Sequence, residues 1–355
     1  MTAARDVPYG DSRMPRFAAV DVGVSSVLPA AETVRLARAA EALGVRRFWI
    51  AEEFHWRSST ATAAAVALGT TSIEVGLGIV SPFARHPGVL AMEAATLQEL
   101  AGGRFLLGLG ASVIGLLRHR QWGRVRIARG MREGLGLVKR LLAGETVSFD
   151  GEVFRLDRAR VGFLGPDGAR VPVHAGVLSP RNLEMAGELA DGLLLGIFCT
   201  PEFVKGCLDH VRRGAEGAGR SVAEMEVGMY ALLAVDRDPA AARAAVKDTI
   251  ADYIAWGEVP EERAEAIGMT REEYRGLMAR MTEAYGRGDR EGMRRAVPEG
   301  LVDALAITGT PEACARTLLP FAEAGVTRLI PYHVLGPDRG RGLETVIRDL
   351  APLLL

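Results

Sequence analysis

Residues 73–110 read IEVGLGIVSPFARHPGVLAMEAATLQELAGGRFLLGLG, two glycine-containing apolar segments on either side of a helix-like segment. The segments 73–80 and 104–109 are rich in branched apolar residues, as expected of parallel strands covered on both faces. Between them, apolar residues recur at helical spacing, a proline opens the predicted helix and a glycine pair ends it. This stretch therefore predicts one strand–helix–strand unit.

The same alternation of strand and helix recurs along the whole chain. Several predicted helices begin with a capping residue followed by proline, at Ser179, Thr200, Asp238 and Thr310. Such a cap satisfies a free backbone N–H, and proline at the first helical position wastes no donor. Eight units in this order predict an α/β fold, a closed (β/α)8 TIM barrel with insertions, with a doubly wound open sheet as the alternative. The eight predicted strands are 16–22, 47–51, 73–80, 105–109, 171–175, 192–197, 226–235 and 328–331.

The chain has 355 residues, more than the roughly 250 that a single barrel needs. In one insertion, predicted strands 147–149 and 153–156 flank Asp150-Gly151 as a hairpin. In the other, Thr270 and Glu273 have the spacing of a capping box, and the segment could be a lid, a subunit contact or a solvated helical excursion. We therefore expect an N-terminal tail over 1–15 and a single barrel domain over 16–355, with insertions at 143–170 and 255–300.

Composition restricts the function classes. A formal net charge of −1 and the lack of basic stretches interleaved with aromatics argue against nucleic-acid binding. No segment approaches the roughly 18 uninterrupted apolar residues of a membrane span, so no membrane partner is expected. The six histidines never pair at a ligand spacing, so no metal site is predicted. The three dispersed cysteines indicate a reduced, cytoplasmic protein.

Polar residues cluster where predicted strands end, which is where barrel enzymes place their chemistry. The loop after the second strand contains Glu52, Glu53, His55, Trp56 and Arg57. In a partly desolvated pocket, such carboxylates beside a histidine could shift one another's pKa and act as acid or base. The alternative is that one carboxylate merely forms an ion pair with Arg57.

Two further strand ends carry glycines. Gly78 after the third strand would let the backbone approach something large and flat, while nearby His86 is expected only to cap or brace the next helix. After the fifth strand, residues 175–181 run into a helix start with a serine and an arginine, which predicts a phosphate site. The arginine-rich segment 118–132 is either a solvated face or a set of contacts for an anionic cofactor tail.

Three segments carry a family resemblance: residues 44–58 (GVRRFWIAEEFHWRS), 76–110 and 175–192 (AGVLSPRNLEMAGELADG). The chain resembles the luciferase-like monooxygenase superfamily, in the branch of coenzyme F420-dependent reductases that includes methylenetetrahydromethanopterin reductase. The resemblance implies hydride transfer between the deazaflavin ring and a small organic substrate, in an enzyme that is often a homodimer. Alternatives on the same fold are a two-component monooxygenase that uses reduced FMN, and a non-catalytic flavin- or deazaflavin-binding protein.

The resemblance also implies site residues. Relatives commonly have Asp-His where this chain has Glu52-Glu53, so the catalytic role of that histidine passes to Glu53 or to the displaced His55. Val113 stands where the sugar-phosphate dehydrogenases have an acid, which makes glucose 6-phosphate an unexpected substrate. A non-proline cis peptide is implied at Gly78-Ile79. The implied cofactor-binding residues are Glu52, Gly78, Ile79, Ser81, Gly110, Ala111, Ser112, Gly176, Val177, Leu178, Ser179, Arg181 and Asn182.

Overall fold

The fold is a closed barrel of eight parallel strands, seen in a computed structural model that describes residues 16–111, 126–259, 261–265 and 267–355. Strand β12 pairs with both β10 and β2, which closes the sheet and confirms the predicted TIM barrel over the open-sheet alternative. The short strands β1 (Ala19–Val20) and β11 (Ile307–Gly309) extend the pairing of β12 and β10. In barrel order the strands are β2 (Val22–Ser25), β3 (Arg47–Ala51), β4 (Glu74–Val80), β5 (Phe105–Gly110), β8 (Val173–Gly176), β9 (Gly192–Leu195), β10 (Glu226–Val235) and β12 (Arg328–Leu335).

Two of the predicted barrel strands have boundaries that differ from the structure by more than two residues. The first strand was expected at 16–22, but the barrel strand β2 begins at Val22, after the short β1. The last strand was expected to end at Pro331 and instead runs to Leu335. Pairing from both sides explains this continuation, because Tyr332 lies opposite Gly23 of β2 and Leu232 of β10. The additional strand residues place Tyr332 at the end of the barrel where the pocket lies.

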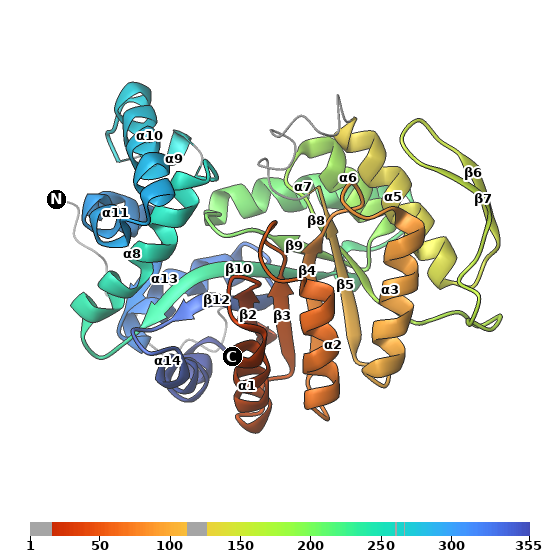
Figure 1. Cartoon of the computed structure of the whole chain (residues 1–355), viewed down its shortest axis with the longest axis horizontal. Coiled ribbons are helices and arrows are strands. Elements are labelled where there is room, and N and C mark those ends of the chain that lie inside the picture. The colour runs from red at the N-terminus through yellow and green to blue at the C-terminus, as the bar shows by residue number, and fades with distance from the viewer. Residues whose placement is uncertain (1–15, 112–125, 260, 266) are drawn as a thin grey trace.

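Helices surround the barrel (Figure 1). As predicted, the side chains of Thr200, Asp238 and Thr310 cap their helices by accepting a backbone N–H. Ser179 also precedes a helix but makes no capping bond, so its hydroxyl is left for other partners. The barrel helices are α1 (Ala30–Ala42), α2 (Ser59–Gly69), α3 (Pro87–Leu100), α5 (Ile127–Leu142), α6 (Pro180–Leu189), α7 (Pro201–Gly217), α8 (Pro239–Ala255), α13 (Pro311–Glu323) and α14 (Arg339–Thr345), with short helical turns at Val222–Glu224, Val346–Leu350 and Ala351–Leu354.

The predicted hairpin in the first insertion is present as β6 (Val147–Asp150) paired with β7 (Arg155–Ala159). Its second strand was expected from residue 153 but begins two residues later. The cause is Glu133 of α5, whose carboxylate accepts the backbone N–H groups of residues 152, 153 and 154 at 3.0 Å each. These donors are therefore used by a side chain and not by a partner strand.

The second insertion is helical, with α9 (Glu261–Glu265), α10 (Arg271–Arg287), α11 (Arg290–Ala296) and α12 (Glu299–Leu305). The capping box of Thr270 and Glu273 is confirmed. Apolar residues of these helices share one buried cluster with side chains from inside the barrel, among them Trp49 and Tyr332. The insertion therefore has a buried face and is more than a solvated excursion.

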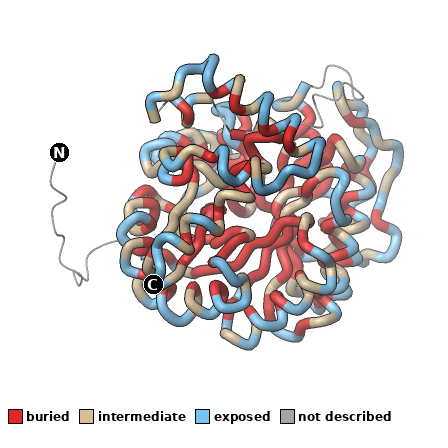
Figure 2. The backbone as a smooth tube through the Cα atoms, turned by 60° about the vertical axis from the view of Figure 1, so that its left-hand side comes forward, coloured by how far each residue is buried: buried red, intermediate tan, exposed pale blue. Residues whose placement is uncertain are grey.

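The barrel interior is buried, and ion pairs fill one of its two ends. The strands are buried and the outer faces of the helices are exposed (Figure 2). At the N-terminal ends of the strands, Arg328 binds Asp21 at 2.6 Å and Arg47 binds Glu226 at 2.7 Å, which fills that end with ion pairs. The opposite, C-terminal end therefore remains as the way for a ligand to reach the barrel.

No helix within the described ranges is long and apolar enough to cross a membrane.

Candidate active site

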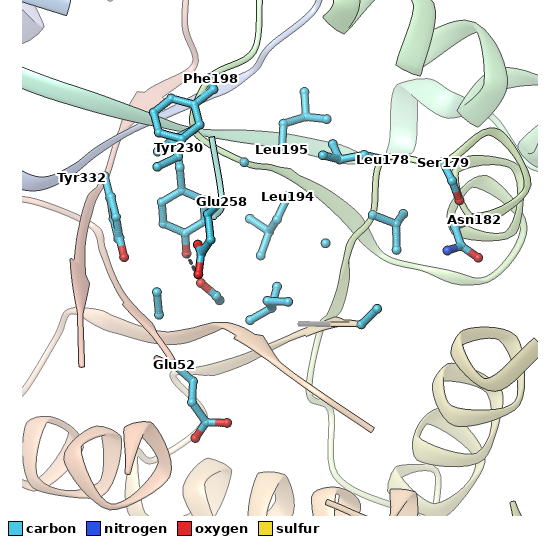
Figure 3. Close-up of a pocket in the computed structure, with 18 of the residues that line it drawn as sticks. Glu52, Leu178, Ser179, Asn182, Leu194, Leu195, Phe198, Tyr230, Glu258 and Tyr332 are labelled. Atoms are coloured by element: carbon cyan, nitrogen blue, oxygen red, sulfur yellow. Dashed lines mark hydrogen bonds between the residues drawn. The ribbon is translucent and has the colours of Figure 1, made fainter. Parts of the chain in front are cut away.

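A cavity of about 720 Å³ lies at the C-terminal ends of the barrel strands. Figure 3 shows Ser179 and Asn182 at one side of it and Phe198, Glu258 and Tyr332 at the other, with Leu194 and Leu195 between. The walls are mostly apolar, and polar groups gather at the two sides, which is the usual character of a small-molecule site. The residues predicted from sequence that line this cavity are Glu52, Glu53, Gly78, Ile79, Ala111, Gly176, Val177, Leu178, Ser179 and Asn182.

The floor of the pocket is a bulge in β4. The peptide bond between Gly78 and Ile79 is cis, as the resemblance implied, and the pairing of β4 with β5 shifts register between Leu77 and Val80. The Ile79 side chain is seated on two neighbouring strand ends. A Cβ at Gly110 would lie 2.2 Å from its Cδ1, and one at Gly176 would lie 2.4 Å from its Cγ2. These glycines therefore make room for Ile79, which shapes the pocket floor.

Gly78 lines the pocket and also makes room for a side chain from the opposite barrel wall. A Cβ there would lie 2.2 Å from the hydroxyl oxygen of Tyr230, on the inner side of the barrel. That hydroxyl donates a 2.8 Å hydrogen bond to the carbonyl oxygen of Gly78. The missing side chain thus admits a tyrosine from β10.

Glu53 lies in the pocket wall with 8% of its surface exposed. The hydroxyls of Tyr253 and Tyr332 each donate to its Oε1 at 3.4 Å, and its backbone N–H donates to the Ser26 hydroxyl at 2.8 Å. Burial raises the pKa of this carboxyl to about 7, although the tyrosine hydrogen bonds oppose the shift. Glu53 can therefore hold or release a proton near neutral pH.

Glu52 points away from the other labelled side chains in Figure 3. Its carboxylate receives two bonds from the Arg85 guanidinium, at 2.5 and 2.6 Å, and one from the Ser59 hydroxyl at 2.9 Å. Arg57 instead donates to the carbonyl of Val27, so the alternative of an ion pair between this loop's carboxylates and Arg57 was wrong. Glu52 is thus paired with Arg85 and holds the loop in place.

The other polar side of the pocket is the start of α6. Ser179 has a free hydroxyl there, and Asn182 is 7% exposed with a buried Oδ1 that has no hydrogen-bond partner in the described structure. Because an amide can turn either its oxygen or its NH2 group to a given position, this site can accept from or donate to a ligand. Backbone N–H groups at a helix start add a preference for negative charge.

The comparisons agree with this geometry. Residues 15–328 match the family model described as Luciferase-like monooxygenase. This chain belongs to that family. Its relatives include the 5,10-methylenetetrahydromethanopterin reductase of Archaeoglobus fulgidus, 27% identical over 89% of this chain and 93% of the relative. An F420-dependent glucose-6-phosphate dehydrogenase of Nakamurella multipartita is 31% identical, over 91% and 92%. The structure of the coenzyme F420-dependent tetrahydromethanopterin reductase of Methanopyrus kandleri superposes with a TM-score of 0.83 at 25% identity, covering 96% of this chain and all of that one.

Some predicted residues of this luciferase-like protein lie outside the pocket lining. Ser81 is buried and donates to the carbonyl of Ala111 at 3.2 Å, so it joins the β4 bulge to the end of β5. Gly110 lies beneath Ile79, while His55 and Arg181 are exposed. Ser112 and Val113 lie outside the described residues, as do the arginines of the charge run before Arg126. His86, in contrast, caps α3 as expected, by accepting the N–H of Gly88.

The described part of the arginine run is paired with acids. Arg126 binds Glu152, Arg129 binds Glu133 at 2.8 Å, and Arg132 binds Glu188 at 2.7 Å. These three side chains are 41% exposed or more as well as ion-paired, which favours the solvated face over contacts with a cofactor tail at these positions.

Sequence reasoning missed the aromatic and acidic side of the pocket. Tyr230 lies on the predicted strand 226–235 and Tyr332 comes directly after the predicted strand 328–331, so large polar aromatics at inward positions could have indicated them. Tyr253 and Glu258 gave no local signal, because they come from the end of α8 and the following segment, some 200 residues from Glu53 in the sequence.

Proposed function

We propose that this luciferase-like protein is an F420-dependent oxidoreductase that transfers a hydride between the deazaflavin ring and a small organic substrate. Support comes from two relatives of different activity, a reductase and a sugar-phosphate dehydrogenase. Both match nearly the whole chain, and both are named as F420-dependent. Support also comes from the pocket, whose volume and apolar walls suit a planar redox cofactor together with a substrate.

The pocket residues fit such a cofactor. Ile79 on its glycine seat would support the ring, and Ser179 with Asn182 and the start of α6 would hold the phosphate-bearing part. The orphaned amide of Asn182 is the observation that favours an extended polar ligand at this side, since a buried polar atom without a partner is costly. When bound, the cofactor supplies the two-electron hydride chemistry.

The proton would be managed by Glu53. This carboxyl lies in the pocket wall, and its pKa of about 7 places the protonated form within reach at physiological pH. During reduction it would donate its proton to the substrate atom that gains negative charge, and during oxidation it would accept one. The hydroxyls of Tyr253 and Tyr332 fix the position of the carboxyl and stabilise the carboxylate after transfer. The position and pKa of Glu53 favour it over the exposed His55.

A direct test is an equilibrium titration of the purified protein with oxidised F420, followed by cofactor fluorescence, with FMN as the matched comparison. Saturable binding of F420 and weak binding of FMN are expected. Preference for FMN would overturn the proposal in favour of a two-component monooxygenase. Tight F420 binding without turnover of any reducible substrate by reduced F420 would instead favour a non-catalytic binding protein.

We also propose that the protein is a cytoplasmic homodimer. Apolar side chains are exposed on the neighbouring helices α2 and α3, with Leu68 at 70%, Met92 at 50% and Val89 at 41% exposure. Such a surface favours burial against a second copy. The three cysteines are free, which fits a reducing compartment. Light scattering should give a dimer mass for the wild-type chain and a monomer mass for Leu68→Glu; a monomeric wild type would refute the dimer.

A further inference from the structure

The ionisable residues that line the pocket are all acidic. Three acidic residues line it, Glu52, Glu53 and Glu258, and no lysine, arginine or histidine is among its lining residues within the described ranges. Arg85 neutralises Glu52 from outside the pocket. The side that contains Glu53 and Glu258 therefore offers acids to a ligand and no base.

Glu258 is the unexplained member of this set. It follows α8, at the start of the second insertion, and its carboxyl has no hydrogen bond or ion pair in the part of the chain that the structure describes. In Figure 3 its side chain lies among the other labelled side chains of the pocket. Burial and the charge of Glu53 raise its pKa to about 8. Two acids that disfavour each other's ionisation gain most from a partner of positive charge.

The walls beside these acids are aromatic. The rings of Phe198 and Tyr253 meet edge to face at 5.7 Å, and those of Tyr230 and Tyr332 do so at 5.3 Å. All four line the cavity. The face of an aromatic ring attracts cations and repels anions, and this attraction is stronger where water is excluded. Aromatic faces and carboxyls thus favour the same kind of ligand.

We propose that the substrate presents a basic or cationic nitrogen, as an imine, iminium or amine, to the side of the pocket formed by Glu53, Glu258 and these aromatic rings. Glu258 is then a specificity-determining residue. The reaction assigned to such a substrate rests on the proposed function, whereas its binding does not. Anionic substrates are disfavoured, so the acid pair distinguishes this chain's substrate from the sugar phosphate that names its 31% identical relative.

The chemistry balances for a neutral imine. A hydride, with its two electrons, adds to the imine carbon, the C=N π pair moves to nitrogen, and nitrogen takes the proton of the Glu53 carboxyl to give an amine. An iminium ion needs only the hydride, because its nitrogen already carries the positive charge that the new electron pair neutralises. Oxidation of an amine is the reverse. The remaining Glu53 carboxylate is stabilised by the two tyrosine hydroxyls.

Binding can be tested without cofactor by calorimetric titration of the full-length protein. The probes are N-methyl-3,4-dihydroisoquinolinium, its uncharged isostere 3-methyl-1,2-dihydronaphthalene and the anion 3,4-dihydronaphthalene-2-carboxylate. The cation should bind about tenfold more tightly than the isostere, and the anion more weakly than both. Equal affinities, or a preference for the anion, would overturn the inference.

The variant that tests the residue is Glu258→Gln, with Glu262→Gln as its control. Glu262 lies in the same insertion but is exposed. Glu258→Gln should weaken binding of the cation about tenfold and change the affinity for the isostere by no more than about twofold. Unchanged binding of the isostere also shows that the pocket remains folded. Glu262→Gln should change neither. If Glu258→Gln leaves the cation's affinity unchanged, Glu258 does not select the substrate. Failure of F420 to bind in a separate titration, with cation binding intact, would contradict the proposed function alone.

Discussion

The hydroxyl of Tyr230 donates a hydrogen bond to the carbonyl oxygen of Gly78, at 2.8 Å, across the interior of the barrel. Tyr230 belongs to β10 and Gly78 to β4, so this bond joins the pocket floor to a strand on the opposite wall. Tyr230 is 7% exposed, and a Cβ at residue 78 would collide with its hydroxyl. The β4 bulge is thus held from inside the barrel.

We expect Tyr230→Phe to lower the free energy of unfolding by about 1–3 kcal/mol, because a buried carbonyl loses its donor. The affinity for F420 should fall as well, since the bulge that supports the ring is less well fixed. Urea unfolding and a fluorescence titration measure the two effects. The matched control is Tyr285→Phe on α10, a tyrosine outside the pocket. Equal behaviour of the two variants would mean that the Tyr230 hydroxyl does not support the floor.

The seat of Ile79 gives a second prediction. In Gly176→Ala, the new Cβ would lie 2.4 Å from Ile79 Cγ2, while its next neighbours are at 3.6 Å or more. We expect a loss of about 1–3 kcal/mol in the free energy of unfolding from this overpacking. Adding Ile79→Ala removes the colliding atom, so the double variant should recover most of that loss. Denaturant unfolding of the four proteins in a double-mutant cycle measures the coupling.

Gly110→Ala is the control for this cycle. Its Cβ would also lie 2.7 Å from the backbone carbonyl oxygen of Gly176, which Ile79→Ala leaves in place. Rescue should therefore be strong for Gly176→Ala and weak for Gly110→Ala. Additive effects at Gly176 and Ile79 would show that the glycine does not serve as a seat.

The eight barrel strands could be predicted from the sequence because each is a local apolar run followed by a capped helix. Errors arose where distant partners decide, as in β7, whose start is set by the carboxylate of Glu133, and in β12, which continues past Pro331 because both neighbouring strands pair with it. Local pattern carries no information on such contacts.

The candidate site divides in the same way. Glu53, Ile79 and Asn182 lie near strand ends or in the first turn of a helix, so their place in the barrel could be inferred from the sequence alone. Tyr253 enters the pocket from the end of α8 and Glu258 from the start of the second insertion, whose path depends on how its helices pack against residues of the barrel interior. The contact between Gly78 and Tyr230 could not be inferred from the sequence, because the tyrosine comes from a distant strand.

Glu53→Gln should change how stability depends on pH. The folded pKa of about 7 is above the ordinary 4.5, so the folded state binds more protons than the unfolded chain between these values. Wild-type stability contributed by this group is therefore present below about 4.5 and is lost as pH rises to about 7. The glutamine variant lacks this loss and should be more stable than wild type by about 3 kcal/mol at pH 8, with no difference at pH 4. Urea unfolding at several pH values measures this.

The same substitution, Glu53→Gln, should lower the rate of catalysis although it raises stability. Glu53→Gln has no proton to give and should lose about 10²–10⁴-fold in kcat for a reduction that needs one. Wild-type kcat/KM for that reduction should fall as pH rises through about 7. Glu262→Gln serves as control for both measurements. A glutamine variant with a wild-type rate would remove Glu53 from the mechanism.

The start of α6 gives the last prediction, which separates recognition of the cofactor's phosphate from recognition of its ring. Asn182→Leu removes the buried amide at nearly constant volume, and Ser179→Ala removes the uncapped hydroxyl. Each should weaken the binding of F420 about tenfold and leave the affinity for a deazaflavin analogue without the phosphate unchanged. Only the intact cofactor is expected to reach the start of α6. Arg181 is exposed and outside the lining, so Arg181→Ala should have a smaller effect that disappears in high salt. Fluorescence titrations of both ligands decide the matter: if Asn182→Leu weakens the analogue as much as F420, the residue supports the ring or the fold and not the phosphate.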